Sequence, residues 1–416
     1  MSLLKKIQIL IYSTLLLIAC TSAPGNKKIN KQDSLSYLQP IPGTLSKADF
    51  DKYYNAIEVF YETKLVASGF NGAILVAKNG QVIFEKYHGF FNLQKKDSLN
   101  EHSAFHLASV SKTFTAMATL KLVEQGKLKL DDSVKNYFLG FPYSGITVRM
   151  LLNHRSGLPN YLYFMQQLGW DVKQYCNNND VVDYLIKYQP PLTHLPNTHF
   201  SYCNTNYCLL GLIIEKISGK TYAEFLKQTF FTPLQMNDTY VFSLADSARA
   251  MPSYDWRGRA ERLTFLDVGF GDKNIYSTAR DLLKWDQAMY NNQIFSKQTL
   301  EDAFAPYSNE KLGIKNYGFG WRMNIYPNGK KIIFHGGWWH GNNTMLMRLI
   351  QDSATIIIVG NKYNRNVYQA KKLANIFSYY FESDEEDRSE NMTEPIDTIV
   401  KPQKKIRSNI KHKKHH

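Results

Sequence analysis

The spacing of hydrophobic and polar positions changes along the chain. It predicts strands near both ends and helices in the middle. Residues 46–68 carry apolar side chains at helical spacing, and Ser46 is a candidate N-cap. Residues 72–78 and 81–87 are rich in β-forming side chains and are separated by Asn-Gly. This pair favours a tight hairpin turn, so we expect a β-hairpin directly after the first helix.

The middle of the chain shows mainly helical spacing. We expect one helix from Ser109 to Gly126 and a short one over residues 146–152, which a Gly and a Pro close. Three further helices are expected over residues 204–217, 221–227 and 282–289. Residues 160–200 show little strand signal. This region therefore predicts a mostly helical lobe.

Strand-like runs return near the C-terminal end, at residues 320–323, 332–335, 344–350 and 355–359. An amphipathic pattern over residues 367–381 predicts a closing helix. The expected fold class is α/β (α+β). Its antiparallel sheet is built from both ends of the chain, is flanked by helices and carries the inserted helical lobe.

The N-terminal segment has the features of an export signal. Two lysines precede an apolar run from Ile7 to Ala19, which is too short for a stable membrane span. The run ends in Leu-Ile-Ala-Cys, which resembles the bacterial lipobox and makes Cys20 the expected lipidation site. The alternative is an ordinary cleaved signal with an incidental cysteine. We expect a lipid-anchored protein of the bacterial cell envelope, at the outer membrane or the periplasmic face.

These features divide the chain into four parts. We expect a lipoprotein signal peptide at 1–19, a polar tether at 20–45, the folded domain at 46–381 and a disordered tail at 382–416. The tail is acidic over its first half and basic over its second half, so its charges nearly cancel.

The formal net charge of +14 raises the question of nucleic-acid binding. No nucleic-acid motif accompanies the charge, so we expect no nucleic-acid partner. We interpret the charge instead as a basic surface that faces an anionic polymer of the cell envelope. Three cysteines remain after Cys20, at Cys176, Cys203 and Cys208. Two of them could pair in an exported protein, or all three could pack as free thiols; the sequence does not choose.

The central motif is Ser109-Val-Ser-Lys112, which follows a short apolar run and opens a long helix. Residues three apart share one face of a helix, so the lysine is expected beside the serine hydroxyl. A helix N-terminus also offers unpaired N–H groups. Together these features suit a nucleophile with its own base. The same spacing recurs elsewhere in the chain, where an N-cap serine and a solvated lysine explain it.

A second motif, Tyr202-Cys-Asn204, leads into the apolar helix near residue 204. Tyr-x-Asn also occurs elsewhere, and Tyr175 in the same lobe is the main competitor. We prefer Tyr202 because a long helix follows it, whereas Tyr175 precedes a loop-like polar stretch. A core tyrosine with a satisfied hydroxyl is the structural alternative for Tyr202.

With these segments and His335-Gly-Gly337 in order, the chain resembles the serine β-lactamase and penicillin-binding protein superfamily. It looks most like the branch of class C β-lactamases, D-alanyl-D-alanine carboxypeptidases, D-aminopeptidases and related esterases. The resemblance implies that Ser109 attacks a carbonyl carbon. It also implies that Lys112 either accepts the proton or lowers the pKa of Tyr202 so that the phenolate does. A free tyrosine titrates near ~10 and would otherwise be a poor base.

The resemblance gives further roles near the nucleophile. It implies that Asn204 binds the substrate amide or orients the lysine, and that the backbone N–H groups of Ser109 and Trp338 form an oxyanion hole. His335 stands where many relatives carry a lysine. A neutral imidazole is a weaker partner for a carboxylate, which disfavours an efficient β-lactamase. Gly337 lets the strand approach a substrate closely.

The leading hypothesis is a serine hydrolase without cofactor or metal, because no zinc-ligand spacing occurs in the folded part. Its expected substrates are D-amino-acid-containing peptides of cell-wall metabolism, or small esters and amides. The alternatives are a binding or sensor module that does not turn over, a true β-lactamase, and a structural envelope lipoprotein. The sequence leaves the oligomeric state open.

Overall fold

A computed structural model describes residues 45–290 and 294–382 of the chain. The expected signal peptide, the lipidation site at Cys20, nearly all of the tether and all but the first residue of the expected tail lie outside the described residues. The predictions for these segments therefore stay predictions.

The centre of the fold is a seven-stranded sheet in the order β2-β1-β12-β11-β10-β9-β8, and all of its neighbouring strands run antiparallel. The strands are β1 (Gly72–Lys78), β2 (Gln81–His88), β8 (Lys315–Tyr317), β9 (Arg322–Ile325), β10 (Lys331–Trp339), β11 (Asn342–Leu349) and β12 (Ala354–Gly360). Two strands come from early in the described chain and five from late in it, which confirms the predicted fold class.

Both faces of this sheet are buried, and the strand residues alternate between two hydrophobic clusters. In β12, Ile357 and Val359 join the cluster on the helical-lobe side, whereas Ile356 and Ile358 join the opposite one. Successive side chains of a strand point to opposite faces, so one apolar run supplies both layers. This explains why the strands read as nearly continuous apolar sequence.

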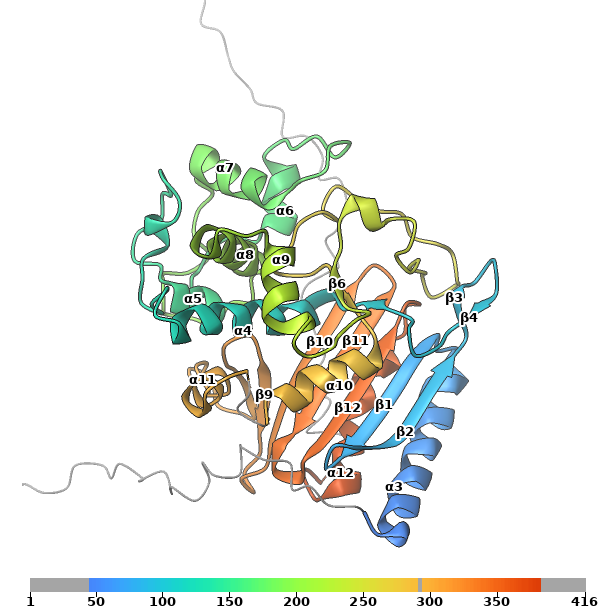
Figure 1. The fold of residues 1–416 in the computed structure, drawn as a ribbon. Coiled ribbons are helices and arrows are strands. Elements are labelled where there is room, and N and C mark those ends of the chain that lie inside the picture. Colours follow the sequence, from blue (N-terminus) through green and yellow to red (C-terminus); the bar gives the residue numbers. More distant parts are fainter. Residues whose placement is uncertain (1–44, 291–293, 383–416) are drawn as a thin grey trace, which may run out of the picture. The chain divides into compact units, whose positions relative to one another are not determined.

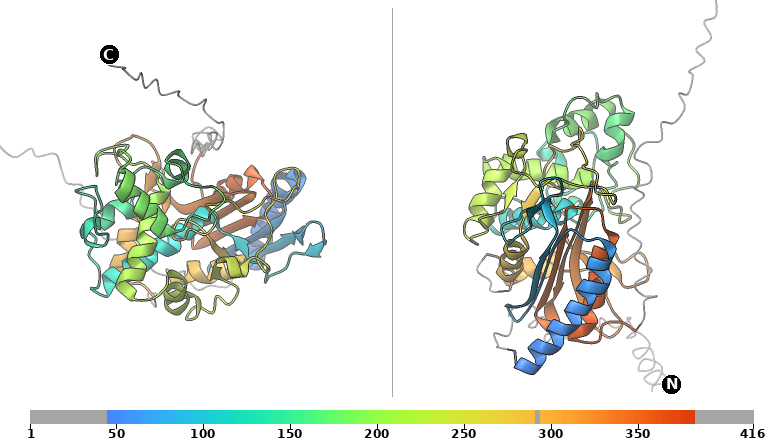
Figure 2. Two further views of the ribbon diagram at one scale, coloured as in Figure 1. Left: turned by 90° about the horizontal axis from the view of Figure 1, so that it is seen from above. Right: turned by 90° about the vertical axis from the view of Figure 1, so that its right-hand side faces the viewer.

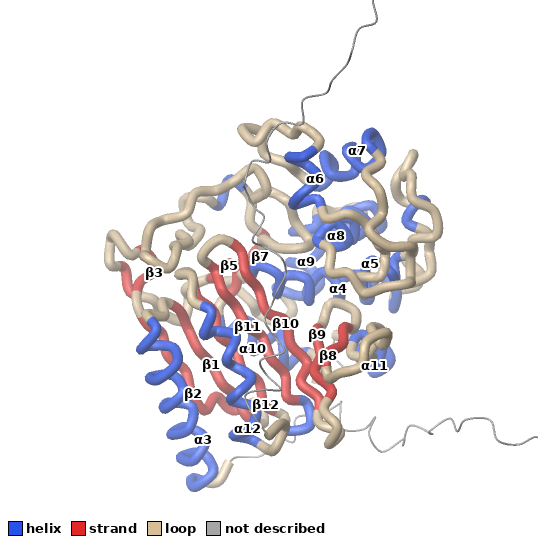
Figure 3. The backbone as a smooth tube through the Cα atoms, turned by 180° about the vertical axis from the view of Figure 1, so that it is seen from behind, coloured by secondary structure: helices blue, strands red, loops and turns tan. Residues whose placement is uncertain are grey.

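Helices cover the two faces (Figures 1 and 2). One face packs against α3 (Lys47–Phe60) and α12 (Ala374–Phe377), which are seen from that side in Figure 3. The other face packs against α10 (Ala279–Ala288) and the helical lobe. The remaining helices are α4 (Ser111–Glu124), α5 (Val148–Leu152), α6 (Tyr161–Gln167), α7 (Asn178–Tyr188), α8 (Asn204–Ser218), α9 (Tyr222–Leu226) and α11 (Lys297–Ala303).

Several short strands complete the fold, and the sequence pattern indicated only one of them, the strand end just before Ser109. A two-stranded sheet pairs β3 (Phe90–Asn92) with β4 (Asp97–Ser98). A three-stranded sheet joins β5 (Phe105–His106), β7 (Ile275–Ser277) and β6 (Tyr240–Val241). These runs are only two or three residues long, so they contain no alternation that a pattern search could recognise.

The first predicted helix is confirmed, because the Ser46 hydroxyl accepts a hydrogen bond from the backbone N–H of Asp49 at the start of α3. The closing helix over residues 367–381 is wrong in type and extent. The chain forms a 3₁₀ helix, η9 (Arg365–Leu373), and then the single turn α12. The Asn375 side chain explains the ending: it accepts from the N–H of Tyr380 and donates to the carbonyl of Phe381, folding the chain back.

The three cysteines of the folded part, Cys176, Cys203 and Cys208, are free and buried. Within the described ranges, no helix has the length and apolar character needed to cross a bilayer. The same ranges contain no group of three or more His, Cys, Asp or Glu side chains that could hold a metal ion.

We expect Arg348→Met to lower the free energy of unfolding by about 3–5 kcal/mol, because it leaves Asp286 buried without its charged partner. Arg348 on β11 donates to the Asp286 carboxylate on α10, and both side chains are 1% exposed. Urea denaturation would measure the loss. The exposed Arg149–Asp131 pair gives the control, since Arg149→Met should cost only about 0–1 kcal/mol. Equal losses in the two variants would contradict the prediction.

Candidate active site

Ser109 lies in a 3₁₀ turn, η4 (Ala108–Val110), directly before α4. The sequence placed it in the first turn of the helix, and the structure moves it just ahead of that turn. The neighbouring strands hold the turn in place. The N–H of Leu107 donates to Ile275 O at 2.8 Å, and the N–H of Ile275 donates to Ser111 Oγ at 3.1 Å. The serine is partly exposed, as an attacking group must be.

Lys112 is fully buried next to this serine, and its Nζ donates hydrogen bonds to three oxygens. They are Ser109 Oγ at 3.1 Å, Asn204 Oδ1 at 2.7 Å and the backbone oxygen of Asp272 at 2.9 Å. Burying an amino group is costly unless hydrogen bonds replace its hydration. The three oxygens provide that replacement and fix the direction of the amine.

Tyr202 completes this group of residues. Its ring centroid lies 4.9 Å from Lys112 Nζ. It precedes α8, whose first residue, Asn204, contacts the same amine. Tyr175, the competing candidate, is 43% exposed. The structure therefore brings together Ser109, Lys112, Tyr202 and Asn204.

His154 supports this group from behind. It is fully buried, and its ring lies 4.3 Å from that of Tyr202. Its Nδ1 accepts from the N–H of Cys203 at 3.1 Å and lies 3.2 Å from Asn206 Nδ2. Burial lowers the pKa of His154, and the nearby charge of Lys112 lowers it further, so the ring stays neutral. Its contacts fix the segment that carries Tyr202 and Asn204.

His106 supports the serine turn itself. Ala108 has φ of 49°, a left-handed conformation that is strained for a residue with a Cβ. Its N–H donates to His106 Nδ1 at 3.0 Å, and His106 Nε2 lies 2.8 Å from Asn274 Oδ1. The Asn274 amide nitrogen donates to two backbone carbonyls, so its oxygen must accept from the imidazole. The proton is thereby placed on Nε2, and the lone pair of Nδ1 faces Ala108.

Strand β10 passes close to the same turn at Gly337. A Cβ at this position would lie 2.3 Å from the backbone oxygen of Leu107, so only glycine fits without movement. Thr344 on β11 donates to that same oxygen at 2.8 Å. The Trp338 side chain leaves the site, since its ring packs 5.4 Å from Tyr363. Only the backbone of Trp338 is thus available beside the serine turn, and its oxyanion role stays a prediction.

His335 is fully buried on β10. Its Nδ1 lies 2.8 Å from Gly336 O, which can only accept, so this nitrogen carries the proton. Nε2 then accepts from the Tyr317 hydroxyl at 3.2 Å. Burial lowers the pKa of His335 well below its usual range, and the charges of Arg322 and Lys112 add to that effect. The imidazole is neutral and both nitrogens are engaged, so a substrate contact would require one of these bonds to break.

Sequence reasoning missed three contributors to the site. Asp272 acts through its backbone oxygen, which no residue-type pattern reveals. His106 was part of the serine segment, but its bond to Ala108 depends on a left-handed turn. Arg322, whose guanidinium carbon lies 4.8 Å from the Tyr202 ring centroid, comes from the short strand β9. The signal in the sequence that could have indicated Arg322 is that a charged residue stands within an otherwise apolar run.

We expect His106→Phe to slow covalent labelling of Ser109 by a fluorophosphonate by at least about tenfold, because the serine turn loses the acceptor that holds Ala108. Asparagine can place its side-chain oxygen near the position of Nδ1, so His106→Asn should restore most of the rate. Intact-mass kinetics would measure both variants, with circular dichroism to verify folding. Unchanged labelling in a folded His106→Phe protein would contradict this positioning role.

The buried histidines also predict how stability depends on pH. Burial lowers the pKa of His106 to about 4, whereas an unfolded histidine titrates near ~6.5. Below pH ~6.5 the unfolded chain therefore binds more protons, and the unfolding free energy falls as the pH falls. Between pH 7 and pH 5, His106 alone should account for about 2 kcal/mol of this decrease. In urea denaturation, His106→Asn should show a correspondingly shallower dependence; parallel curves for the two proteins would contradict it.

Comparison with known proteins agrees with this geometry. The sequence matches the beta-lactamase family over residues 61–381. It is 35% identical to penicillin-binding protein 4* of Bacillus subtilis, over 75% of this chain and 73% of that protein. It is 27% identical to protein flp of Staphylococcus aureus, over 73% of this chain and 62% of that protein.

Solved structures share the fold. An octameric penicillin-binding protein homologue from Pyrococcus abyssi matches with a TM-score of 0.66 and 26% identity, over 77% of this chain and 76% of that chain. A D-amino acid amidase from Ochrobactrum anthropi matches with a TM-score of 0.63 and 22% identity, over 77% of this chain and 97% of that chain. The chain therefore belongs to the beta-lactamase family and has the fold of its penicillin-binding relatives.

Proposed function

We propose that this protein is a serine hydrolase that forms an acyl-enzyme on Ser109. The observation that carries the proposal is the buried Lys112 amine, whose Nζ lies 3.1 Å from Ser109 Oγ and is held there by Asn204 and Asp272. A nucleophile within hydrogen-bond reach of a base, with that base oriented by further groups, is the arrangement that covalent catalysis needs.

In the proposed first step, Lys112 Nζ acts as a base on Ser109 Oγ, the third of its three oxygen contacts. In the neutral form, two N–H bonds donate to Asn204 Oδ1 and Asp272 O, so the lone pair faces Ser109 Oγ. Lys112 then takes the hydroxyl proton while Oγ bonds to the substrate carbonyl carbon. The backbone N–H groups of Ser109 and Trp338 would stabilise the resulting oxyanion, which is worth a few kcal/mol per donor.

Collapse of the oxyanion breaks the bond to the leaving group. Tyr202, whose ring packs against Lys112, would pass the proton to that nitrogen or oxygen. Water then attacks the acyl carbon, breaks its bond to Oγ and releases a carboxylic acid and free Ser109. Both steps balance without a cofactor or metal.

We propose a D-amino-acid-containing peptide or amide, or a small ester, as the substrate. The shared fold of a D-amino acid amidase and of a D-stereospecific amidohydrolase from Streptomyces supports this class. The neutral, buried His335 supplies no fixed positive charge on β10 for a β-lactam carboxylate, so a β-lactamase is the weaker candidate.

A second candidate function is penicillin binding without turnover, as a sensor or binding module. The likeness to a protein named for penicillin binding favours it. Under this alternative Ser109 is acylated as above, but water does not release the adduct.

We expect penicillin or a fluorophosphonate to add one covalent adduct to the purified protein, and Ser109→Ala to add none. Hydrolysis of a D-amino acid amide or a nitrophenyl ester should fall by at least about a thousandfold in this variant, because the nucleophile is lost. Intact mass and initial rates give the two measurements. Ser98→Ala, at an exposed serine, is the matched control and should behave like the unmodified protein.

The outcomes separate the candidates. Turnover with a transient adduct supports the hydrolase, and a stable penicillin adduct without turnover supports the binding module. Rapid hydrolysis of nitrocefin would instead favour the β-lactamase function. Full activity in Ser109→Ala would end the proposal.

A further inference from the structure

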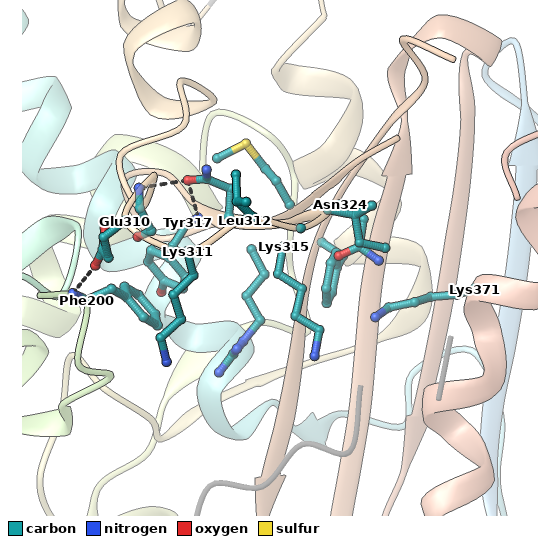
Figure 4. A pocket seen from close by; sticks show the side chains of 15 residues that line it. Phe200, Glu310, Lys311, Leu312, Lys315, Tyr317, Asn324 and Lys371 are labelled. Atoms are coloured by element: carbon teal, nitrogen blue, oxygen red, sulfur yellow. Dashed lines mark hydrogen bonds between the residues drawn. The ribbon is translucent and has the colours of Figure 1, made fainter. Parts of the chain in front are cut away.

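Two cavities in the described part of the chain differ in their relation to Ser109. The larger cavity, of about 450 Å³, is bordered by β8, β9 and the loop over residues 308–314 (Figure 4), and Ser109 does not line it. The smaller cavity, of about 200 Å³, is lined by His106, which supports the serine turn. Asp267 and His340 line the same cavity. The wall of the smaller cavity is therefore connected with the nucleophile.

Asp267 is an enclosed carboxylate in this wall, with 2% of its surface exposed. Its Oδ2 accepts hydrogen bonds from the backbone N–H of Thr264 and, at 2.8 Å, from the Thr264 hydroxyl. Its Oδ1 accepts from the indole Nε1 of Trp339. His340 Nε2 lies 3.0 Å from each of the two oxygens. These partners replace the hydration that a buried carboxylate loses, so the side chain is held in one place.

His340 lies between two carboxylates, because its Nε2 contacts Asp267 and its Nδ1 lies 3.3 Å from Glu261 Oε2. Ionised carboxylates only accept hydrogen bonds, so both ring nitrogens carry protons. Burial alone would lower the pKa of His340, but the hydrogen bonds and charges of Asp267 and Glu261 raise it to about 9. The backbone of His340 has φ of 51°, a left-handed conformation that persists only where the surroundings hold it.

The side chain of Asp267 holds the end of β10. The two residues that it binds there, Trp339 and His340, directly follow Trp338, whose backbone N–H is the proposed second donor of the oxyanion hole. The indole Nε1 of Trp338 also donates to the backbone oxygen of His340 at 2.7 Å. The position of the Trp338 N–H therefore depends on residues that Asp267 fixes.

The backbone oxygen of Asp267 leads to the serine turn. It accepts from Asn274 Nδ2 at 2.8 Å, and Asn274 Oδ1 accepts from His106 Nε2 at 2.8 Å. His106 Nδ1 accepts from the N–H of Ala108, the residue before Ser109, at 3.0 Å. All four residues that form this path are buried, so water does not compete for its three hydrogen bonds. Asp267 is thus connected with the turn that carries the first oxyanion donor.

We propose that Asp267 is the positioning residue that sets the separation of the two oxyanion donors, the backbone N–H groups of Ser109 and Trp338. Its side chain holds the strand that carries one donor, and its backbone oxygen holds the turn that carries the other. This inference rests on the proposed function and adds to it a residue that does not contact Ser109. Such donors must lie within about 3 Å of the developing oxyanion, so a change in their separation weakens the stabilisation of the transition state.

The first test is Asp267→Asn, which keeps the shape of the side chain and removes its charge. The amide nitrogen cannot accept a hydrogen bond, so some of the groups that now donate to the carboxylate must move. We expect kcat for a nitrophenyl ester to fall at least about tenfold while KM changes less than about threefold, because the oxyanion donors act in the transition state. Labelling of Ser109 by a fluorophosphonate should slow with kcat.

The second test compares two variants of His340. Glutamine can place a side-chain N–H near the position of Nε2, so His340→Gln keeps a donor for Asp267 and should retain most of kcat. His340→Leu offers no donor and should lose at least about tenfold in kcat, again with little change in KM.

The matched control is another histidine–aspartate pair, His102 with Asp238, whose side chains are 72% and 35% exposed and whose atoms lie 2.9 Å apart. Asp238→Asn should leave both kcat and KM unchanged. Urea denaturation of every variant measures stability separately from the rates.

Each outcome decides the inference. A lower kcat at nearly constant KM in Asp267→Asn supports the positioning role. Unchanged kcat in the folded variant, a rise in KM alone, or an equal loss in Asp238→Asn overturns it. The His340 pair decides the question even where Asp267→Asn does not fold, since equal rates in His340→Leu and His340→Gln overturn the role. Absence of both ester hydrolysis and a fluorophosphonate adduct in the unmodified protein would instead overturn the proposed function itself.

Discussion

The hydrogen bonding of the buried Lys112 amine is the constraint on which the arrangement of the site depends. An amino group with no exposed surface must find oxygens inside the protein, and here they come from three separate segments. The serine turn, the start of α8 and the loop before β7 must all meet at one point. The requirement of one side chain thus ties the helical lobe to the sheet and aims the amine at Ser109.

This meeting point is also where the backbone departs from ordinary geometry. Ala108 and His154 both adopt left-handed conformations, and both are held by hydrogen bonds from the surrounding structure. The Ala108 N–H donates to His106, and the His154 carbonyl accepts from Ser201 at 2.9 Å. Strain of this kind persists only where the surroundings determine it, and it concentrates at functional sites. The two strained residues flank the nucleophile and Tyr202, respectively.

The fold could be predicted because strands such as β1 and β12 are long runs of β-forming side chains, and an Asn-Gly turn follows β1. Ser109, Lys112, Tyr202 and Asn204 could be proposed as partners because their motifs keep recognisable spacings, and the structure brings them together. The short strands β3, β4, β6 and β7 could not be predicted, since two or three residues carry no period. The end of α12 could not be predicted either, because the Asn375 side chain sets it through contacts with Tyr380 and Phe381. A strand pattern gives the face of the sheet on which His335 lies, but it does not show how deeply the side chain is buried. The hydrogen bond between His335 and Tyr317 could therefore not be predicted.

The charges around Tyr202 can be explained by the same reasoning about depth. On β10 the position next to the reactive group is fully enclosed, so a permanent charge there would have to be buried, and a neutral imidazole is tolerated instead. On the other side, β8 and β9 border a cavity whose lining includes Lys315 and Arg322. Arg322 lies at the boundary between these two environments and stacks on the Tyr202 ring. The Tyr202 ring thus lies 4.8 Å from the guanidinium carbon of Arg322 and 6.2 Å from the neutral ring of His335.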